Sequence, residues 1–530
     1  MNTTPYSEGS KDAPILFLAE APAKWEMIKG RPLVGESGTI FDKSLYHSGL
    51  IRSEVQIANV LRNPTNSIDP YLSKGSLTDR GRDAVDDLKQ RLRDCRARVV
   101  VPMGNLALKA CTDEFAISKW RGSPTPSTIE GIPWAIPTYH PASTMIGRGP
   151  YINRHVIISD IKKAKRISEA ERFEYPRRHL HIFPTFQEVV QYLRSIDGYP
   201  KPVAFDIEIY NFQVSCISFA HKPDYSISIP FVGDKWTEEE ECIIWQLIAA
   251  VLENPKNTLV AHNAMFDVSF LYLQNQIRTR ATIHDTMIMQ RILAPDFPAA
   301  LQFITSIYTD EPYYKDDKQI WKTPEKDEEK FYRYNAKDSA VTIECFPPLF
   351  EDIMKDKDFR WTYENTMSLF EPCLYMMARG VKLDLENLSK LKESVREQIK
   401  ERESDLRDIV GSDLNYNSPK QCIEYFYGHK GIKPYINRKT SRPTVDDKAL
   451  ARIVRKYNLP EARLVQELRG LSKLYGTYLD LDYDKDGRLR CTYDIRGTTS
   501  GRLSSKKTIF ETGMNMQNLD PRFKGFVVCD

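Results

Sequence analysis

Short apolar runs alternate with amphipathic stretches along the first two thirds of the chain. Residues 14–19, 99–104 and 203–209 are each short and almost wholly apolar, which predicts buried strands. Residues 258–263 form another such run, and the apolar residues that follow from about residue 266 predict a helix. Strands that alternate with helices predict an α/β architecture with its site at the strand ends.

The pattern changes in the last third of the chain. Residues 385–410 and 450–478 carry apolar residues at spacings of three and four among many charged ones, which predicts amphipathic, antiparallel helices. Lys and Arg are frequent on their polar sides, as on a surface that holds phosphates by charge. A solvated helix face explains any one of these charges equally well.

Two carboxylates interrupt the apolar run 203–209. Asp206 and Glu208 are two residues apart, so the alternation of a strand places both on one face. An Asp-x-Glu pair alone indicates no more than a solvated turn or strand edge. Acids inside a buried strand, however, need a positive partner.

Three further polar groups follow in order. Asp267 begins the helix after strand 258–263, where an acid is commonly just a cap. Tyr334 and Asp338 are four apart, so a helix places them on one face, as in many ordinary surface pairs. Four clustered acids together form a typical binding site for divalent cations. A pair of Mg²⁺ or Mn²⁺ ions about 3.5–4 Å apart can activate water and stabilise the leaving oxygen of a phosphodiester. The sequence therefore predicts a two-metal phosphodiesterase site.

These clusters, in this order, resemble the three motifs of the proofreading 3′ to 5′ exonuclease domain of family A DNA polymerases, over residues 178–355. The resemblance implies an RNase H-like fold, a single-stranded 3′ end of DNA as substrate, and a role for Tyr334 in orienting the attacking water. It assigns Asn263 to DNA binding, whereas Asp285 is expected to be a satisfied buried acid. The ligands it implies for the two cations are Asp206, Glu208, Asp267 and Asp338.

A second group of motifs lies downstream. Thr499–Ser505 and Asn515–Asn518 resemble the palm entry of family A polymerases, and residues 417–421, 442–446 and 471–479 fall where that family has its thumb. An Arg can reach minor-groove acceptors shared by all base pairs, and amide side chains add donors without reading sequence. The residues that the resemblance assigns to the primer-template are Arg502, Asn515, Gln517 and Asn518.

The chain ends at Asp530, which the family spacing places before the first metal ligand of the polymerase site. We therefore expect the nucleotidyl-transfer residues beyond residue 530. The sequence is then incomplete, deliberately shortened, or one part of an interrupted gene whose remainder is supplied by a second polypeptide.

The first 170 residues have their own motifs. Glu20 follows strand 14–19, Asn59 ends an apolar strand, and His140 lies in Tyr-His-Pro-Ala. This pattern resembles the uracil-DNA glycosylase superfamily, especially its iron-sulfur branch. The resemblance implies that Glu20 and Asn59 handle the water and the flipped base, and that His140 stabilises the uracil anion.

Two departures from that family bear on activity. The first of the nine cysteines is Cys95 and no Cys-x-x-Cys occurs, so no iron-sulfur cluster is expected. Leu33 stands where the family has an aromatic residue that stacks on uracil, a loss of about 1–3 kcal/mol of stacking. A non-catalytic DNA-binding or uracil-sensing domain is therefore favoured over a working glycosylase.

Composition adds three constraints. The 530 residues, 41% of them hydrophobic, are enough for several folded domains, and the unpatterned cysteines suit a reducing compartment. No apolar run reaches spanning length, which argues against a membrane protein. The net charge of +3 is nearly balanced, so DNA binding must come from local basic surfaces. The basic run proposed for this role is Lys162, Lys163, Lys165, Arg166, Arg172, Arg177 and Arg178.

These observations predict an α/β multidomain chain. Its predicted parts are a glycosylase-like α/β sandwich (1–170), a basic linker (171–178), an exonuclease domain (179–355), a helical thumb (356–490) and the start of a palm (491–530). The expected protein is the N-terminal part of a replicative family A DNA polymerase with proofreading activity, similar to those of large lytic bacteriophages and acting in the cytoplasm of the infected host. The alternatives are a free-standing 3′ to 5′ exonuclease and a non-catalytic subunit that binds primer-template.

Overall fold

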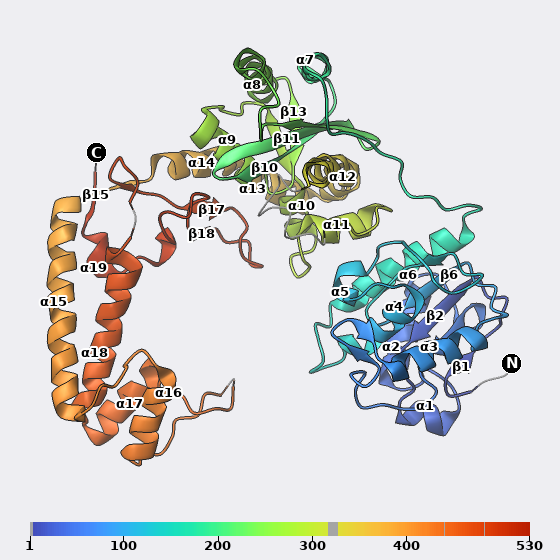
Figure 1. Cartoon of the computed structure of the whole chain (residues 1–530), viewed down its shortest axis with the longest axis horizontal. Helices are drawn as coiled ribbons and strands as arrows, with labels where there is room; N and C mark the ends of the chain where they lie inside the picture. The colour runs from blue at the N-terminus through green and yellow to red at the C-terminus, as the bar shows by residue number, and fades with distance from the viewer. Residues whose placement is uncertain (1–3, 316–326, 439, 482, 530) are drawn as a thin grey trace. The chain divides into compact units, whose positions relative to one another are not determined.

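The computed structural model describes residues 4–315, 327–438, 440–481 and 483–529. The chain divides into two compact units, Met1–Met367 and Ser368–Asp530 (Figure 1). Asp530 itself, on which one prediction falls, lies outside the described residues.

The N-terminal part of the first unit is built on a six-stranded sheet. Its strand order is β1-β3-β2-β6-β8-β7, with β3, β2, β6 and β8 parallel. The strands are β1 (Ser7–Glu8), β2 (Ile15–Ala19), β3 (Gln56–Asn59), β6 (Val99–Pro102), β7 (Thr125–Pro126) and β8 (Trp134–Ala135), beside a small hairpin of β4 (Leu72–Ser73) and β5 (Ser76–Leu77). The helices are α1 (Lys24–Lys29), α2 (Glu36–His47), α3 (Asp79–Arg91), α4 (Asn105–Cys111), α5 (Ile117–Trp120) and α6 (Asn153–Glu169).

Alternation along β2 explains why this sheet is covered on both faces. Leu16 and Leu18 join a core with α3 and α4, whereas Ile15 and Phe17 join a second core with α2 and α6. All five residues of β2 are buried. A strand buried on both sides must be continuously apolar, as the sequence pattern predicts.

The second part of the first unit contains another six-stranded sheet, of order β14-β13-β10-β11-β12-β9. Strands β10, β11 and β12 are antiparallel neighbours, and β13 and β14 run parallel beside β10. The strands are β9 (His179–His181), β10 (Val203–Tyr210), β11 (Gln213–Lys222), β12 (Tyr225–Pro230), β13 (Thr258–Ala261) and β14 (Thr282–Asp285). The helices are α7 (Phe186–Ile196), α8 (Glu238–Glu253), α9 (Ala264–Asn275), α10 (Thr286–Leu293), α11 (Leu301–Tyr308), α12 (Glu328–Lys355) and α13 (Lys357–Ser368).

Helix α12 packs across β10, β11 and β12 (Figure 1). Phe331, Ala336 and Leu349 of α12 are fully buried. Because α12 carries the third predicted motif and β10 the first, this packing brings the two motifs together.

The basic run 162–178 is not the open DNA-binding surface that its charge predicts. Lys163 is buried and donates hydrogen bonds to the carbonyl oxygens of Gly122, Ser306 and Thr309. Arg178, whose side chain is only 4% exposed, pairs with two acids. These acids are Glu311 and Glu344. At these positions the prediction of a basic surface is wrong, because the charged groups of both residues are occupied by hydrogen bonds and ion pairs within the first unit.

The second unit consists mainly of helices. They are α14 (Phe370–Arg379), α15 (Leu385–Val410), α16 (Pro419–Ile423), α17 (Asp447–Tyr457), α18 (Pro460–Leu474) and α19 (Pro521–Lys524). A small sheet has the order β16-β15-β19, and β17 pairs with β18. These strands are β15 (Val381–Leu383), β16 (Arg488–Leu489), β17 (Thr492–Asp494), β18 (Ser504–Lys506) and β19 (Val527–Val528).

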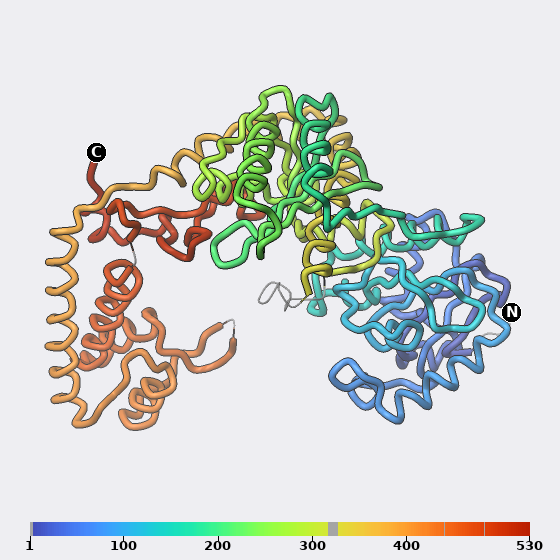
Figure 2. Tube along the Cα trace, turned by 45° about the horizontal axis from the view of Figure 1, so that its top comes forward, coloured from blue at the N-terminus to red at the C-terminus, as the bar shows by residue number. Residues whose placement is uncertain are grey.

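Helices α15 and α18 lie side by side and run antiparallel, as predicted (Figures 1 and 2). The start of α15 at Leu388 shares a core with Leu474 at the end of α18, whereas Leu406 near the end of α15 packs with Val465. The predicted helical stretch 450–478 is divided: α17 ends at Tyr457, and the next residue, Asn458, adopts a left-handed conformation with φ 49°.

Candidate functional site

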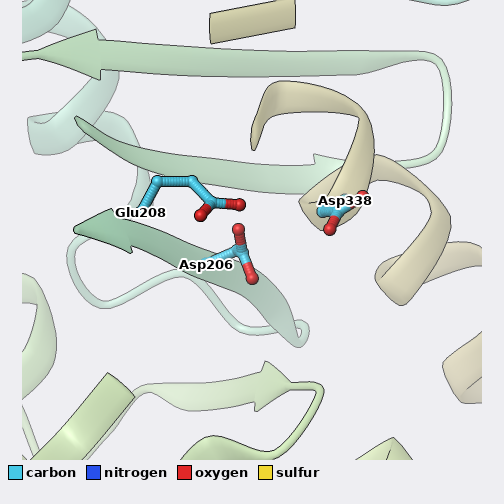
Figure 3. A group of neighbouring side chains, drawn as sticks. All are labelled: Asp206, Glu208 and Asp338. Atoms are coloured by element: carbon cyan, nitrogen blue, oxygen red, sulfur yellow. The ribbon is translucent and has the colours of Figure 1, made fainter. Parts of the chain in front are cut away.

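Three of the predicted metal ligands converge in the second sheet. Asp206 and Glu208 project from β10 toward Asp338 on α12 (Figure 3). One ligand oxygen from each of the three lies within 4.8 Å of the others. Alternation on a strand places the first two acids on one face, and the packing of α12 adds the third.

Asn335 ties these elements together. Its amide nitrogen donates hydrogen bonds to the backbone oxygen of Asp206 (3.0 Å) and to carboxylate Oδ2 of the same residue (2.9 Å). Its amide oxygen accepts from the Ser228 hydroxyl on β12 (2.8 Å). Asn335 is fully buried. It therefore orients the Asp206 carboxylate, a role that the sequence did not predict because it depends on contacts between distant strands.

The carboxylate of the fourth acid, Asp267, accepts a hydrogen bond from the backbone of the same strand. The N–H of Ile207 donates to Oδ1 of Asp267 at 3.0 Å. Asp267 is buried in the first turn of α9, as the sequence predicts. It lies close enough for its charge to raise the pKa of Asp206.

Asp285 has a structural role next to Asp267. Its carboxylate accepts hydrogen bonds from the backbone N–H groups of Asn263 and Ala264 and, at the start of α10, from those of Met287 and Ile288. This is the satisfied buried acid that the sequence indicates. It holds the turn at Asn263, whose φ is +69°, and so fixes where α9 begins.

Burial and mutual repulsion disfavour the ionised form of the clustered carboxyl groups. Burial raises the pKa of Asp206 well above its ordinary value, and the charges of Asp338 and Glu208 raise it further. Burial is also the main reason that the pKa of Asp267 is raised. Carboxylates that are costly to ionise in the absence of a positive charge fit hard divalent cations, which bind oxygen ligands and supply that charge.

This site contains two further residues that the sequence did not indicate. The Tyr314 hydroxyl donates a hydrogen bond to Oδ1 of Asp338 (2.7 Å), and the Lys315 ammonium donates to Oδ2 of Asp338 and to the Tyr334 hydroxyl. Tyr334 thus lies at the cluster, as predicted. Tyr314 and Lys315 belong to an irregular segment with no periodic pattern, so the one signal in the sequence is the run Tyr-Tyr-Lys itself.

The three predicted residues of the N-terminal domain meet in a second site. Glu20, Asn59 and His140 line one pocket of about 390 Å³, together with Leu33. Glu20 and Asn59 follow or end the parallel strands β2 and β3, which explains why they meet at one sheet edge. Asn59 is 2% exposed, and its Oδ1 has no hydrogen-bond partner among the described residues.

The chemistry of this pocket is set by backbone contacts. Oε1 of Glu20 accepts a hydrogen bond from Leu106 N–H at the start of α4, and burial raises the Glu20 pKa. Nδ1 of His140 accepts from Ala142 N–H (3.1 Å), which leaves Nε2 to carry the ring proton. Burial lowers the His140 pKa to about 4, so the imidazole is neutral at pH 7. A β-carbon on Gly104 would lie 2.6 Å from the Glu20 carboxyl group, so this position requires glycine.

The predicted primer-template residues gather in the second unit. Arg502, Gln517 and Asn518 are exposed. Asn515 accepts hydrogen bonds from the Ser505 hydroxyl and the Gln517 N–H, and the Gln517 amide donates to Leu503 O, so the segments around 502 and 515 lie against each other.

Sequence comparisons assign a family to each part. The model of the uracil DNA glycosylase superfamily matches residues 6–155, that of the 3'-5' exonuclease matches residues 181–354, and that of DNA polymerase family A matches residues 385–524. The DNA polymerase of Bacillus phage SP01 is 22% identical over 94% of this chain and 62% of its own length. The DNA polymerase of Escherichia phage T5 is 26% identical over 62% of this chain and 42% of its own. The type-4 uracil-DNA glycosylase of Thermotoga maritima is 30% identical over 31% of this chain and 82% of its own.

The order of these parts defines a multidomain protein that joins a glycosylase-like domain to a nuclease domain and a polymerase segment. The chain carries, in order, a domain of the uracil-DNA glycosylase superfamily, a 3′ to 5′ exonuclease domain and a segment similar to the family A DNA polymerases. It spans less than two thirds of the length of the phage polymerases that it matches. Exonuclease domains of this family use divalent metal ions, and the family binds DNA. Within the described part of the chain, no helix has the length and apolarity needed to cross a bilayer.

Proposed function

We propose that the second domain removes nucleotides from the 3′ end of DNA, as the proofreading nuclease of a replicative family A polymerase. The observation that carries this proposal is the approach of Asp206, Glu208 and Asp338 to within 4.8 Å in a domain of the 3′-5′ exonuclease family. Relatives among phage polymerases support a place in DNA replication in the cytoplasm of an infected bacterium.

The ligands proposed for two Mg²⁺ or Mn²⁺ ions are Asp206, Glu208, Asp267 and Asp338. When bound, such a pair supplies a nucleophilic hydroxide and stabilises the charge on the leaving oxygen. The chain's own residues then have distinct tasks. Asn335 holds the Asp206 carboxylate in place, and Tyr334 positions the attacking water. Asn263, at the turn before α9, contacts the DNA strand.

In the second unit, we propose that Arg502, Asn515, Gln517 and Asn518 contact the primer-template. Three of these side chains are exposed, and the family A model includes all four. These contacts would hold the duplex while its 3′ end moves to the nuclease domain.

A nuclease assay tests the proposal. The 530-residue chain should shorten a 5′-labelled single strand with a free 3′ hydroxyl in Mg²⁺ or Mn²⁺, and not in EDTA. The double variant Asp206→Ala/Glu208→Ala should lose this activity while it keeps the wild-type melting temperature in EDTA within a few degrees. Equal digestion by wild type and the double variant would refute the assignment.

A second candidate function belongs to the N-terminal pocket. We propose that it binds an extrahelical uracil and senses the base rather than excising it, because buried Asn59 has an unpartnered acceptor beside neutral His140 while Leu33 offers no ring for stacking. An oligonucleotide with one uracil should bind more tightly than its thymine counterpart, and Asn59→Leu should abolish the difference. Formation of abasic sites by wild type, and not by the Asn59 variant, would instead show excision.

A further inference from the structure

The exonuclease site contains a cation of its own. The Lys315 ammonium donates hydrogen bonds to Oδ2 of Asp338 and to the hydroxyl of Tyr334, and it lies 4.4 Å from the centre of the Tyr334 ring. Its side chain is only 15% exposed. Lys315 therefore faces the acidic cluster and not bulk water.

The two oxygens of Asp338 are both engaged by one short segment. Tyr314 donates to Oδ1 and Lys315 donates to Oδ2. An oxygen that accepts a hydrogen bond from an ammonium group is not simultaneously a good ligand for a divalent cation, because the two positive charges would repel each other at contact distance. Lys315 and a cation at Asp338 are thus competitors for the same carboxylate.

The bond to Tyr334 has a direction. An ammonium group has donors and no acceptor, so the Tyr334 oxygen accepts from Lys315, and the Tyr334 hydroxyl is itself hydrogen-bonded to the Asp338 carboxylate. Lys315 thereby fixes the phenol with its donor toward the acidic cluster. A hydroxyl oriented in this way can hold a water or a phosphate oxygen in one geometry.

The net charge of the site indicates what a lysine contributes there. Four carboxylates and two divalent cations cancel, and a bound phosphodiester then leaves one uncompensated negative charge, which grows as the phosphorus is attacked. A lysine within the cluster supplies the balancing charge. Preorganised positive charge of this kind acts most strongly where water is excluded.

We propose that Lys315 is a positioning residue of the nuclease reaction, which rests on the function proposed above. Its ammonium neutralises Asp338 before cations bind. It then remains on Tyr334 and orients that hydroxyl toward the substrate phosphate and its attacking water. The proposal makes two effects of its removal opposite in sign: cations should bind more tightly, and hydrolysis should be slower.

The experiment compares wild type, Lys315→Met, Lys315→Arg, Tyr334→Phe and the Lys315→Met/Tyr334→Phe pair. Mn²⁺ affinity is measured at one pH by titration calorimetry, and single-turnover hydrolysis is measured with saturating Mn²⁺. Lys315→Met should bind Mn²⁺ several-fold more tightly, yet cleave at least about ten-fold more slowly. Lys315→Arg, which keeps the charge, should restore the wild-type Mn²⁺ affinity. In the Tyr334→Phe background, Lys315→Met should slow cleavage by less than it does in the wild type, because part of the effect of Lys315 passes through that hydroxyl.

The outcomes separate this proposal from its neighbours. Unchanged or weaker Mn²⁺ binding by Lys315→Met, or independent rate losses in the double variant, would overturn the role of Lys315. If Lys315 had a purely structural role, its replacement would weaken both cation binding and hydrolysis. Lys315→Gln is a second variant for the same measurements if Lys315→Met does not fold. Absence of nuclease activity in the wild type would refute the proposed function itself, and the Mn²⁺ affinities would still decide whether Lys315 competes for Asp338.

Discussion

The backbone N–H of Ile207 donates a hydrogen bond of 3.0 Å to Oδ1 of Asp267. Ile207 lies between Asp206 and Glu208 on β10, so this bond attaches the acid at the start of α9 to the strand that carries two others. The second motif is thereby held to the first by a bond from the strand backbone to the Asp267 carboxylate, which also fixes the orientation of that side chain.

This arrangement predicts different roles for two neighbouring buried acids. Asp267→Asn should weaken Mn²⁺ binding at least about ten-fold, because a charge is lost within a few ångströms of the cations. Asp285→Asn should keep the Mn²⁺ affinity and lower the free energy of unfolding by about 1–3 kcal/mol, because an amide cannot accept all four backbone N–H groups. Calorimetric titration and urea unfolding in EDTA measure the two effects. Equal loss of Mn²⁺ affinity in both variants would show that the distinction is wrong.

Asn335 should matter for both stability and activity. Asn335→Ala removes the bonds to Asp206 and Ser228, and it should reduce Mn²⁺ affinity about 10–100-fold, the usual effect of losing a group that orients a metal ligand. The free energy of unfolding should fall by about 1–3 kcal/mol. Asn254→Ala, which removes hydrogen bonds to Asp197 and from the Lys256 N–H away from the site, is the control and should leave the Mn²⁺ affinity unchanged. An Asn335 variant with wild-type affinity would contradict the positioning role.

Local periodicity predicts much of the site and little of its surroundings. Asp206 and Glu208 share a face because a strand alternates, and Tyr334 and Asp338 share one because they are four apart on a helix. Asn335 and Lys315 act through contacts made only when α12 and the segment before it pack on the sheet, and no pattern in the chain reports these contacts. For Lys163 the sequence predicts an exposed charge and the structure shows a buried one. The carbonyl groups that accept its hydrogen bonds are distant along the chain, so the sequence does not reveal them.

The buried Lys163 gives a prediction about DNA binding. Lys163→Met should lower the free energy of unfolding by about 1–3 kcal/mol, because three carbonyl groups lose their donor. It should leave the salt dependence of DNA affinity unchanged, since a lysine that releases no phosphate counterion does not contribute to that slope. Lys162→Met, at the exposed neighbouring position, is the matched control and should not change stability. A smaller salt slope for Lys163→Met would restore the view that this lysine contacts DNA.

His140 predicts a specific dependence of stability on pH. Its pKa is about 4 in the folded chain and about 6.5 when unfolded, so between these values the native state binds fewer protons than the unfolded state. The contribution of this group to the free energy of unfolding is therefore complete above about pH 6.5 and is lost as the pH falls toward 4, by on the order of 1–3 kcal/mol. His140→Gln cannot titrate, so the wild type should lose more stability than the variant between pH 7 and pH 5 in urea unfolding. Parallel losses would mean that the imidazole is not held neutral.

The most direct test of the central claim is anomalous diffraction from crystals of the chain soaked in Mn²⁺ at a wavelength near the manganese edge. We predict two peaks roughly 3.5–4 Å apart among the carboxylates of Asp206, Glu208, Asp267 and Asp338, and none in crystals of Asp206→Ala/Glu208→Ala. Peaks at other positions, or no peak beside these four acids in the wild type, would contradict the assignment of a two-metal nuclease centre.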